Sequence, residues 1–407
     1  MDMTAVDGLK HASMVRAAAH HMLALARAGQ LAHLALDETR LDAAVDLVVE
    51  TTRLNYPTLD IPFHARWRHF AAGGRQLWSE LDAATPWRSV EERVKAAYDL
   101  VIVSVLLDAG AGMGWRFQEP ITGISAGRSE GLGLASLTMF RQGLFSAVAA
   151  EPLRVDAARL QSLTVGDLRR GFQVSADNQL VGLEGRTALL IRLGDELAAL
   201  NPTDPLNQRP SVLADSFMAH VRQHGAIAAP EMLRQVLVTL GGVWPDREGA
   251  VQGAGDAWFH PQGPQTETLG GVVPFHKLSQ WLTYSLIEPL QWAGMAVTDI
   301  DGLTGLPEYR NGGLFLDLGV LALRDPQDWN RSHAVGSPLV VEWRALTVAL
   351  LDLVAGKVRE RLGLDVAALP LAKVLEGGTW AAGRRVAKER RVDGGPPLSI
   401  VSDGTVF

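Results

Sequence analysis

Helical periodicity runs through most of this chain, and it constrains the fold more than any other feature of the sequence. Apolar residues recur at three- and four-residue intervals, the spacing of one face of an α-helix. The segments with this pattern are residues 9–54, 89–107, 179–200, 211–222, 230–240 and 339–361. Alternating strand patterns are scarce. The sequence therefore predicts a mainly α fold with at most a small β element.

The chain shows no clear seam between domains. A length of 407 residues ordinarily suggests more than one domain. The most linker-like segment is residues 201–210, NPTDPLNQRP, which has three prolines and no periodicity. We expect one helical domain over residues 1–407. If it divides into two lobes, these are residues 1–200 and 211–407, with residues 201–210 as the linker.

Charge and composition exclude several classes of protein. The net charge of -7 comes from 38 basic and 45 acidic residues without long runs, which disfavours general attraction to nucleic acids. The absence of cysteine excludes disulfides, thiolate zinc sites and cysteine nucleophiles. The first residues lack the signal-peptide pattern, and the most apolar run, residues 100–107, is far below the ~20 residues of a membrane span. We expect a cytoplasmic protein, a monomer or homodimer, with no nucleic-acid or membrane partner.

Motifs for several kinds of chemistry are missing. The eleven histidines show no HExxH spacing, and no G-x-S-x-G motif occurs. The glycines of DAGAGMGW, residues 108–115, follow a helical pattern rather than a strand, so they do not indicate a dinucleotide site. We expect no metal and no cofactor, although a metal site built from dispersed His and Asp remains open.

Residues 272–320 concentrate the remaining chemistry. Lys277, Gln280, Trp281, Tyr284 and Glu288 lie at helical spacing, and an acidic, glycine-punctuated hairpin is expected after them. Polar residues where a buried helix should be apolar suggest the wall and lip of a pocket.

Three carboxylates follow this helix within ten residues: Asp299, Asp301 and Glu308. The intervening GLTGLP would turn the backbone so that the first and last face one site. Close, buried carboxylates repel, so one can remain an acid while another stays ionised. Hydrolysis at an acetal-like carbon uses that division of roles. The alternatives are a helix cap at Asp299 and a turn residue at Asp301, but the neighbouring Tyr309 and Arg310 favour the catalytic interpretation.

Two further segments carry candidate anion-binding residues. In IPFHARWRHFAAGG, residues 61–74, His64, Arg66, Arg68 and His69 either bind a phosphate or carboxylate or form a solvated helix face around a buried Trp67. In residues 122–146, Arg128, Ser129 and Glu130 stand at a loop-to-helix start, which is either an anion site or an ordinary capped terminus.

The C-terminal third adds two expectations. Glu342 and Arg344 lie two residues apart in the helix predicted at 339–361, so they should serve different partners. Residues 384–407 change from a basic run to Gly-Pro and an apolar end, which predicts an extended segment docked on the body.

The chain resembles the uracil-catabolism protein 4 family of fungi and bacteria over its full length. The landmarks are IPFHARWRHFAAGG (61–74), GRSEGLGLAS (127–136), PFHKLSQWLTYSLIEPL (274–290), GLPEYRNGGLFLDLGVL (305–321) and SDGTVF (402–407). This resemblance implies a role in pyrimidine degradation.

Residues 272–354 also resemble, more remotely, the queuosine-5′-phosphate N-glycosylases, which have an all-helical fold related to helix-hairpin-helix glycosylases. That family has F-Y-K-R-A-Q where this chain has Phe275 to Gln280, and E-V-E-I-R where it has Val340 to Arg344. The family's Asp, followed by I-T-x-F-A-D-Y-R, corresponds to Asp299 and then Leu303 to Arg310. An Asp on the family's first helix is Ser285 here, and the Asp of D-Y-R is Glu308, so a different leaving group is expected.

Together the resemblances imply a hydrolase that cleaves an N-glycosidic bond in a pyrimidine-derived ribotide such as ribosylurea phosphate. Asp299, Asp301 and Glu308 are then the expected catalytic residues. Lys277, Arg128 and Arg310 would neutralise phosphate, and Trp281 and Tyr309 would wall the pocket. The other expected substrate-binding residues are His64, Arg66, Glu130, Phe275, His276, Gln280, Glu342 and Arg344. The alternatives are a non-catalytic binding or scaffold protein for pyrimidine-catabolic intermediates and a DNA-binding glycosylase-like module, which the acidic balance disfavours.

Overall fold

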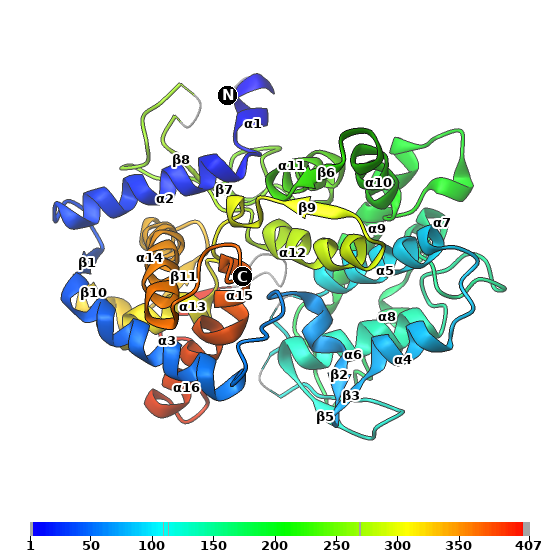
Figure 1. The fold of residues 1–407 in the computed structure, drawn as a ribbon, viewed down its shortest axis with the longest axis horizontal. Coiled ribbons are helices and arrows are strands. Elements are labelled where there is room, and N and C mark those ends of the chain that lie inside the picture. The colour runs from blue at the N-terminus through cyan, green and yellow to red at the C-terminus, as the bar shows by residue number, and fades with distance from the viewer. Residues whose placement is uncertain (1–2, 109, 113, 268–269, 402–407) are drawn as a thin grey trace.

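The computed structural model describes residues 3–108, 110–112, 114–267 and 270–401. It confirms a mainly helical single body with small two-stranded sheets (Figure 1). The α-helices are α1 (Met3–Gly8), α2 (Ala12–Arg27), α3 (Leu41–Asn55), α4 (Leu77–Ala84), α5 (Val90–Leu106), α6 (Arg128–Arg141), α7 (Ala157–Gln161), α8 (Val165–Gly171), α9 (Leu183–Leu200), α10 (Val212–His224), α11 (Ala229–Thr239), α12 (Lys277–Trp292), α13 (Tyr309–Asp317), α14 (Pro338–Leu362), α15 (Leu371–Val374) and α16 (Trp380–Arg390).

Short helical turns and strand pairs connect these helices. The turns are η1 (Glu38–Arg40), η2 (Arg66–Phe70), η3 (Pro205–Asn207), η4 (Gly241–Val243), η5 (Ile300–Gly302), η6 (Pro326–Asn330) and the π-helical η7 (Leu375–Thr379). The antiparallel pairs are β1 (Leu34–Leu36) with β10 (Leu321–Leu323), β2 (Ala71–Ala72) with β3 (Arg75–Gln76), β4 (Phe117–Gln118) with β5 (Ser125–Ala126) and β7 (Ala257–Phe259) with β8 (Val272–Pro274). The parallel pairs are β6 (Ala226–Ala228) with β9 (Ala296–Thr298) and β11 (Ser332–Ala334) with β12 (Ser399–Val401).

The central pair of helices is α5 and α12, which pack against each other in the middle of the body (Figure 1). Helix α5 begins after Ser89, whose hydroxyl accepts a hydrogen bond from the Glu92 amide at 3.1 Å and so caps the start of the helix. Its residues from Val94 onward are largely buried, including every residue from Ala96 to Leu106. The apolar run at 100–107 is therefore a helix surrounded by protein.

The two ends of the chain interlock. Helices α2 and α3 pack against α14, and α3 also contacts α16, so the blue and red segments share one half of the molecule (Figure 1). The 201–210 segment is tied to the core, because the Arg209 guanidinium donates to the buried Asp99 of α5 at 2.9 Å. Across the described helices, no stretch combines the length and apolarity that a bilayer crossing requires.

The prediction of a hairpin after α12 is wrong. Strand β9 pairs in parallel with β6, from a distant part of the chain. The following turn instead packs back onto α12: the Gln280 amide nitrogen donates to the Thr304 hydroxyl at 2.5 Å, and the Tyr284 hydroxyl donates to the Thr304 carbonyl at 3.0 Å. Part of the polar face of α12 is therefore satisfied by the backbone and side chain of this turn.

Candidate functional site

A cavity of about 490 Å³ opens where helices α6, α12 and α13 begin. Residues from eight regions of the sequence line it: His64, His69, Asp108, Gly110, Ala111, Gly112, Arg128, Ser129, Val181, Lys277, Leu278, Trp281, Leu306, Glu308, Tyr309, Trp380, Gly395, Pro396 and Ile400. Of the residues expected at a site, the structure thus brings together His64, Arg128, Lys277, Trp281, Glu308 and Tyr309. A volume of this size suits a small-molecule ligand.

The N-termini of helices α6 and α12 give the cavity a positive electrostatic potential. The backbone N–H groups at the start of a helix carry a partial positive charge that favours anions. Arg128 and Lys277, the first residues of α6 and α12, add two cationic side chains. Arg128 and His276 both have left-handed backbone conformations, with φ of 54° and 49°, and such strain in non-glycine residues clusters at functional sites. An anionic group of a ligand would be stabilised here.

Glu308 and Lys277 are two cavity residues whose charges influence each other's pKa. The Glu308 carboxylate caps α13, accepting hydrogen bonds from the Arg310 amide at 2.7 Å and the Asn311 amide at 2.6 Å. Burial raises the pKa of Glu308, against the lowering effect of these amides and of Lys277. Burial likewise lowers the pKa of Lys277, against the raising effect of Glu308. Glu308 is therefore a carboxyl group whose proton affinity is increased within reach of a buried cation.

Asp108 is a second carboxylate in the cavity, and the sequence interpretation missed it. Its Oδ1 lies 2.9 Å from Nη1 of Arg66, which is fully buried. Arg66 in turn donates through Nε to the Ser104 hydroxyl at 2.6 Å and through Nη1 to the Ser129 carbonyl at 3.1 Å. Arg66 lies behind the cavity wall and thus fixes the position of the Asp108 carboxylate. The sequence signal that could have indicated Asp108 is its place between an apolar helical segment and the glycines of DAGAGMGW.

Aromatic and imidazole rings make up one wall. The centroid of the His64 ring lies 6.4 Å from the centroid of the Trp281 ring and 6.2 Å from that of the Trp380 ring. The centroid of the His69 ring lies 5.7 Å from that of the Trp281 ring. Burial, and then the charge of Arg66, lower the pKa of His69 to about 4, so this imidazole is neutral at neutral pH. The wall offers flat apolar surface beside the charged groups.

Arg344 lies behind the start of α12. Its guanidinium donates to both oxygens of Asp256 at 2.8 and 2.7 Å and stacks 4.1 Å from the centre of the Phe275 ring. Asp256 also accepts from the Lys277 amide at 3.1 Å. Burial acts to raise the pKa of Asp256, but Arg344 holds it well below its usual range. Arg344 and Phe275 therefore position Lys277 rather than line the cavity.

Several other expected binding residues also lie outside the cavity lining. Glu342 accepts from the amides of His33 and Leu34 at 3.1 and 3.0 Å, which confirms that Glu342 and Arg344 serve different partners. His276 bonds the Leu9 carbonyl through Nε2 at 2.9 Å. Arg310 donates to the Gly394 carbonyl at 2.9 Å, Glu130 pairs with Arg384 at 2.7 Å, and Gln280 bonds Thr304.

Asp299 and Asp301 require a correction. Neither lines the cavity with Glu308. Asp299 is exposed in a left-handed turn. Asp301 accepts a hydrogen bond from Arg359 Nη2 at 2.6 Å and bonds the Leu371 amide. The turn expected to bring these acids to Glu308 packs on α12 instead, which leaves Asp299 exposed and directs Asp301 to Arg359.

The C-terminal segment covers part of the cavity. Residues 384–390, predicted as part of an extended segment, instead form the end of helix α16, and the chain after this helix docks on the body as predicted. Strand β12 pairs with β11, and Gly395, Pro396 and Ile400 line the cavity. Arg128 donates to the Asp393 carbonyl at 3.1 Å, beside the Arg310 bond to Gly394. The SDGTVF landmark, with Val406 and Phe407, lies outside the described residues.

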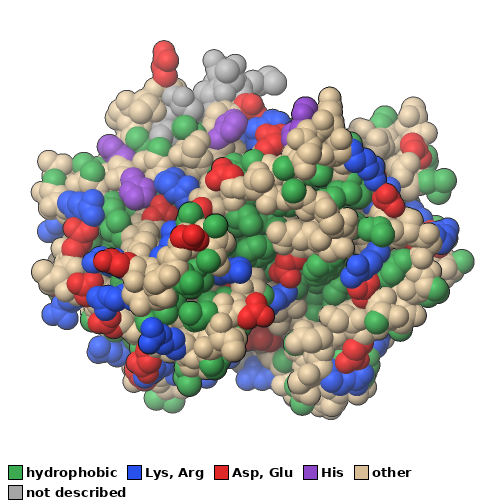
Figure 2. Space-filling view, in the orientation of Figure 1, with side chains coloured by type: hydrophobic (Ala, Val, Ile, Leu, Met, Phe, Trp, Pro, Cys, Tyr) green, Lys and Arg blue, Asp and Glu red, His purple; other side chains and the backbone are tan. Residues whose placement is uncertain are grey.

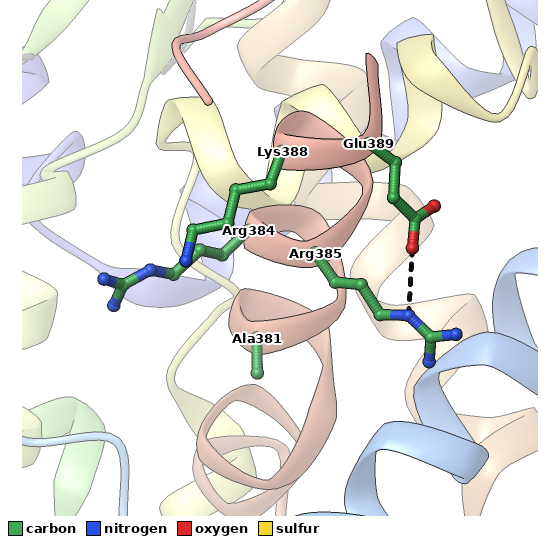
Figure 3. Close-up of a pocket in the computed structure, with 5 residues that line it drawn as sticks. All are labelled: Ala381, Arg384, Arg385, Lys388 and Glu389. Carbon is green, nitrogen blue, oxygen red and sulfur yellow. Dashed lines mark hydrogen bonds and ion pairs between the residues drawn. The ribbon is translucent and has the colours of Figure 1, made fainter. Parts of the chain in front are cut away.

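Two other hollows differ from this cavity. One, on the exposed side of α16, is lined by Ala381, Arg384, Arg385, Lys388 and Glu389. Figure 3 shows Arg385 turned toward Glu389, to which it donates at 3.1 Å. The other is a groove of about 750 Å³, whose walls include Tyr56, Arg68, Glu288, Trp292 and Glu376. On the face shown in Figure 2, acidic and basic side chains are interspersed. Within the described residues, no group of three or more His, Asp or Glu side chains could hold a metal.

The whole chain matches known proteins. Residues 8–407 match the model of a family described as "Protein of unknown function (DUF1688)". The chain is 39% identical to "Protein urg3" of Schizosaccharomyces pombe over 97% of its own length and 96% of the relative's. It is 35% identical to "Uracil catabolism protein 4" of Lachancea kluyveri over 93% of each chain. These matches confirm the full-length resemblance: uracil catabolism protein 4 is a homologue of this chain, and the chain belongs to the DUF1688 family.

Proposed function

We propose that this protein acts in uracil catabolism as a hydrolase that cleaves the N-glycosidic bond of a ring-opened uracil ribotide, ribosylurea phosphate. The observation that carries the proposal is the cavity in which Asp108 and Glu308 share an aromatic-walled space with Lys277 and Arg128. The name of the Lachancea kluyveri relative supports the pathway. The remote glycosylase resemblance supports the reaction and a helical body related to helix-hairpin-helix glycosylases.

The charges of the cavity suit both ends of such a substrate. A ribose phosphate carries an anion, and Arg128, Lys277 and the first amides of α6 and α12 favour one. Cleavage of the bond between C1′ and nitrogen develops positive charge on the sugar and negative charge on the leaving nitrogen. Asp108 stabilises the sugar cation. Glu308, whose pKa is raised by burial, donates a proton to the departing ureide nitrogen.

The reaction balances with water as the only co-substrate. The C1′–N bond breaks and its electron pair stays on nitrogen, which takes the proton of Glu308. Water adds its oxygen to C1′ and gives up a proton. The products are urea and ribose 5-phosphate. Trp281 and Tyr309, which line the cavity, exclude bulk water around the reacting atoms.

Incubation of the purified protein with synthetic ribosylurea 5′-phosphate tests the proposal. We expect equal amounts of urea and ribose 5-phosphate to appear, and Asp108→Asn to lower kcat by about 100-fold or more. Asp299→Asn is the matched control, because this exposed carboxylate is outside the cavity lining, and it should keep full activity. Saturable binding of the ribotide without any product would identify a binding protein instead and overturn the hydrolase assignment.

A further inference from the structure

His64 connects the cavity to the neighbouring groove. Its ring lines the cavity, and its Nδ1 lies 2.8 Å from Oε2 of Glu376. The other oxygen of Glu376 accepts a hydrogen bond from the Tyr56 hydroxyl at 3.1 Å. Glu376 and Tyr56 line the groove. A continuous hydrogen-bonded chain therefore runs from the cavity, through a buried histidine, to a second, open hollow.

The partners fix the tautomer of His64. An ionised carboxylate only accepts hydrogen bonds, so Nδ1 must carry the hydrogen that Glu376 receives. Burial acts to raise the pKa of Glu376, but the bonds from His64 and Tyr56 hold it below its usual range, so it is ionised at neutral pH. Nε2 of His64 has no hydrogen-bond partner among the residues that the structure describes. Its lone pair is available to a molecule in the cavity.

The backbone around Glu376 is built to hold this carboxylate in place. Glu376 lies in the π-helical turn η7 between α15 and α16, and π-turns within helices are frequent at functional sites. The turn packs closely on α3: a Cβ at Gly378 would lie 2.6 Å from the Val48 carbonyl oxygen and 2.4 Å from the Thr52 hydroxyl. Glycine at this position therefore lets η7 approach α3 and sets the position of Glu376.

We propose that His64 is the catalytic base of the cavity and that Glu376 is its positioning residue, an inference that rests on the proposed hydrolysis. Nε2 takes a proton from the attacking water as the water oxygen bonds to C1′. Glu308 gives its proton to the leaving nitrogen in the same cleavage. His64 ends as an imidazolium and Glu308 as a carboxylate, and the transfer of one proton between them through solvent restores both. A carboxylate on Nδ1 orients the imidazole and stabilises its charged form.

The charged surroundings of His64 are defined by several elements. Glu376 of η7 and His69 of η2 interact electrostatically with His64, and Tyr56 and Glu288 interact with Glu376. Glu376 is the group in direct hydrogen-bond contact. Replacing it with a neutral side chain removes the counter-charge that stabilises the imidazolium formed in the reaction.

Kinetics of His64→Gln and Glu376→Gln test the roles with ribosylurea 5′-phosphate. We expect His64→Gln to lower kcat by about 100-fold or more, with KM changed by less than about threefold, because a base acts on the chemical step. Glu376→Gln should likewise lower kcat with little change in KM, because the imidazole loses the carboxylate that orients it and stabilises its charged form. His20→Gln is the matched control, since His20 also pairs with a carboxylate, Asp352, at 2.9 Å but lies outside the cavity lining. A loss of activity in His64→Gln no larger than in His20→Gln would overturn the inference.

Nitrogen-15 NMR of histidine-labelled protein tests the pair without any substrate. In the wild-type protein the His64 resonances should report a proton on Nδ1. In Glu376→Gln the Nδ1 resonance should shift, because its hydrogen-bond acceptor is no longer a carboxylate. A proton on Nε2 in the wild-type protein, or an unchanged Nδ1 resonance in the variant, contradicts the pair. Failure of ribosylurea phosphate to react, with these NMR results obtained, counts against the substrate and the hydrolysis but leaves the His64–Glu376 pair established.

Discussion

The Asp108 carboxylate lies 2.9 Å from the Arg66 guanidinium, which solvent does not reach. The acid belongs to the loop after α5 and the arginine to η2, and they meet at the wall of the cavity. A buried arginine behind a carboxylate orients that carboxylate. This contact combines structural support with the electrostatics of the cavity.

Replacement of Arg66 should destabilise the protein strongly. Arg66→Leu removes one partner of a buried ion pair and leaves Asp108 uncompensated, which typically costs about 3–5 kcal/mol. Urea denaturation followed by circular dichroism measures the free energy of unfolding. The matched control is Arg385→Leu, because Arg385 pairs with exposed acids on the surface of α16, and its unfolding should be nearly unchanged. Equal stability of the two variants would contradict the role of Arg66.

Glu308 should give the stability of the protein a particular pH dependence. Burial raises its folded-state pKa above the ordinary 4.5, so the folded protein binds its proton more tightly than the unfolded chain does. The stabilisation from this group is complete below pH 4.5 and is lost as pH rises through the raised value. Denaturation of wild type and Glu308→Gln across this range should show a difference in free energy that changes with pH. A constant difference would mean that the folded-state pKa is ordinary.

Lys277 should bind the phosphate of the ligand. Calorimetric titration with ribose 5-phosphate should give a dissociation constant about 10-fold or more larger for Lys277→Met, because a charge-assisted hydrogen bond is lost. Burial lowers the pKa of Lys277 from 10.5, so wild-type binding should weaken as pH rises through that lowered value. Lys357→Met, at an exposed pair with Asp42, is the control and should bind normally. Unaltered affinity in Lys277→Met would remove this residue from the phosphate site.

Ile400 should contribute to substrate affinity through the C-terminal segment. Its side chain lines the cavity, whereas its neighbour Val401 is 63% exposed. Truncation to alanine removes apolar contact worth about 1 kcal/mol, or roughly a fivefold increase in KM. Steady-state kinetics with ribosylurea 5′-phosphate should show this increase for Ile400→Ala and no change for Val401→Ala. Similar KM values in both variants would show that the segment does not contact the substrate.

Local features of the sequence predicted local features of the structure well. The segment 89–107 predicted a helix, and α5 spans Val90–Leu106, because Ser89 and the apolar spacing act within a few residues of each other. Six residues expected at a site, including Lys277 and Glu308, do line one cavity. Asp108 was missed because no motif marks an acid that follows a helix, and its significance depends on Arg66, 42 positions earlier in the chain.

The sequence by itself determined that this protein is mainly helical, where several of its longer helices lie, and which family it resembles. Only the tertiary structure decided which acids face the cavity. Side-chain periodicity specifies which face of a helix is apolar, but the direction of a turn depends on what it packs against. Thr304 binds Gln280 on α12, so Asp301 meets Arg359 and not Glu308. That choice was made by long-range packing, which short-range patterns do not encode.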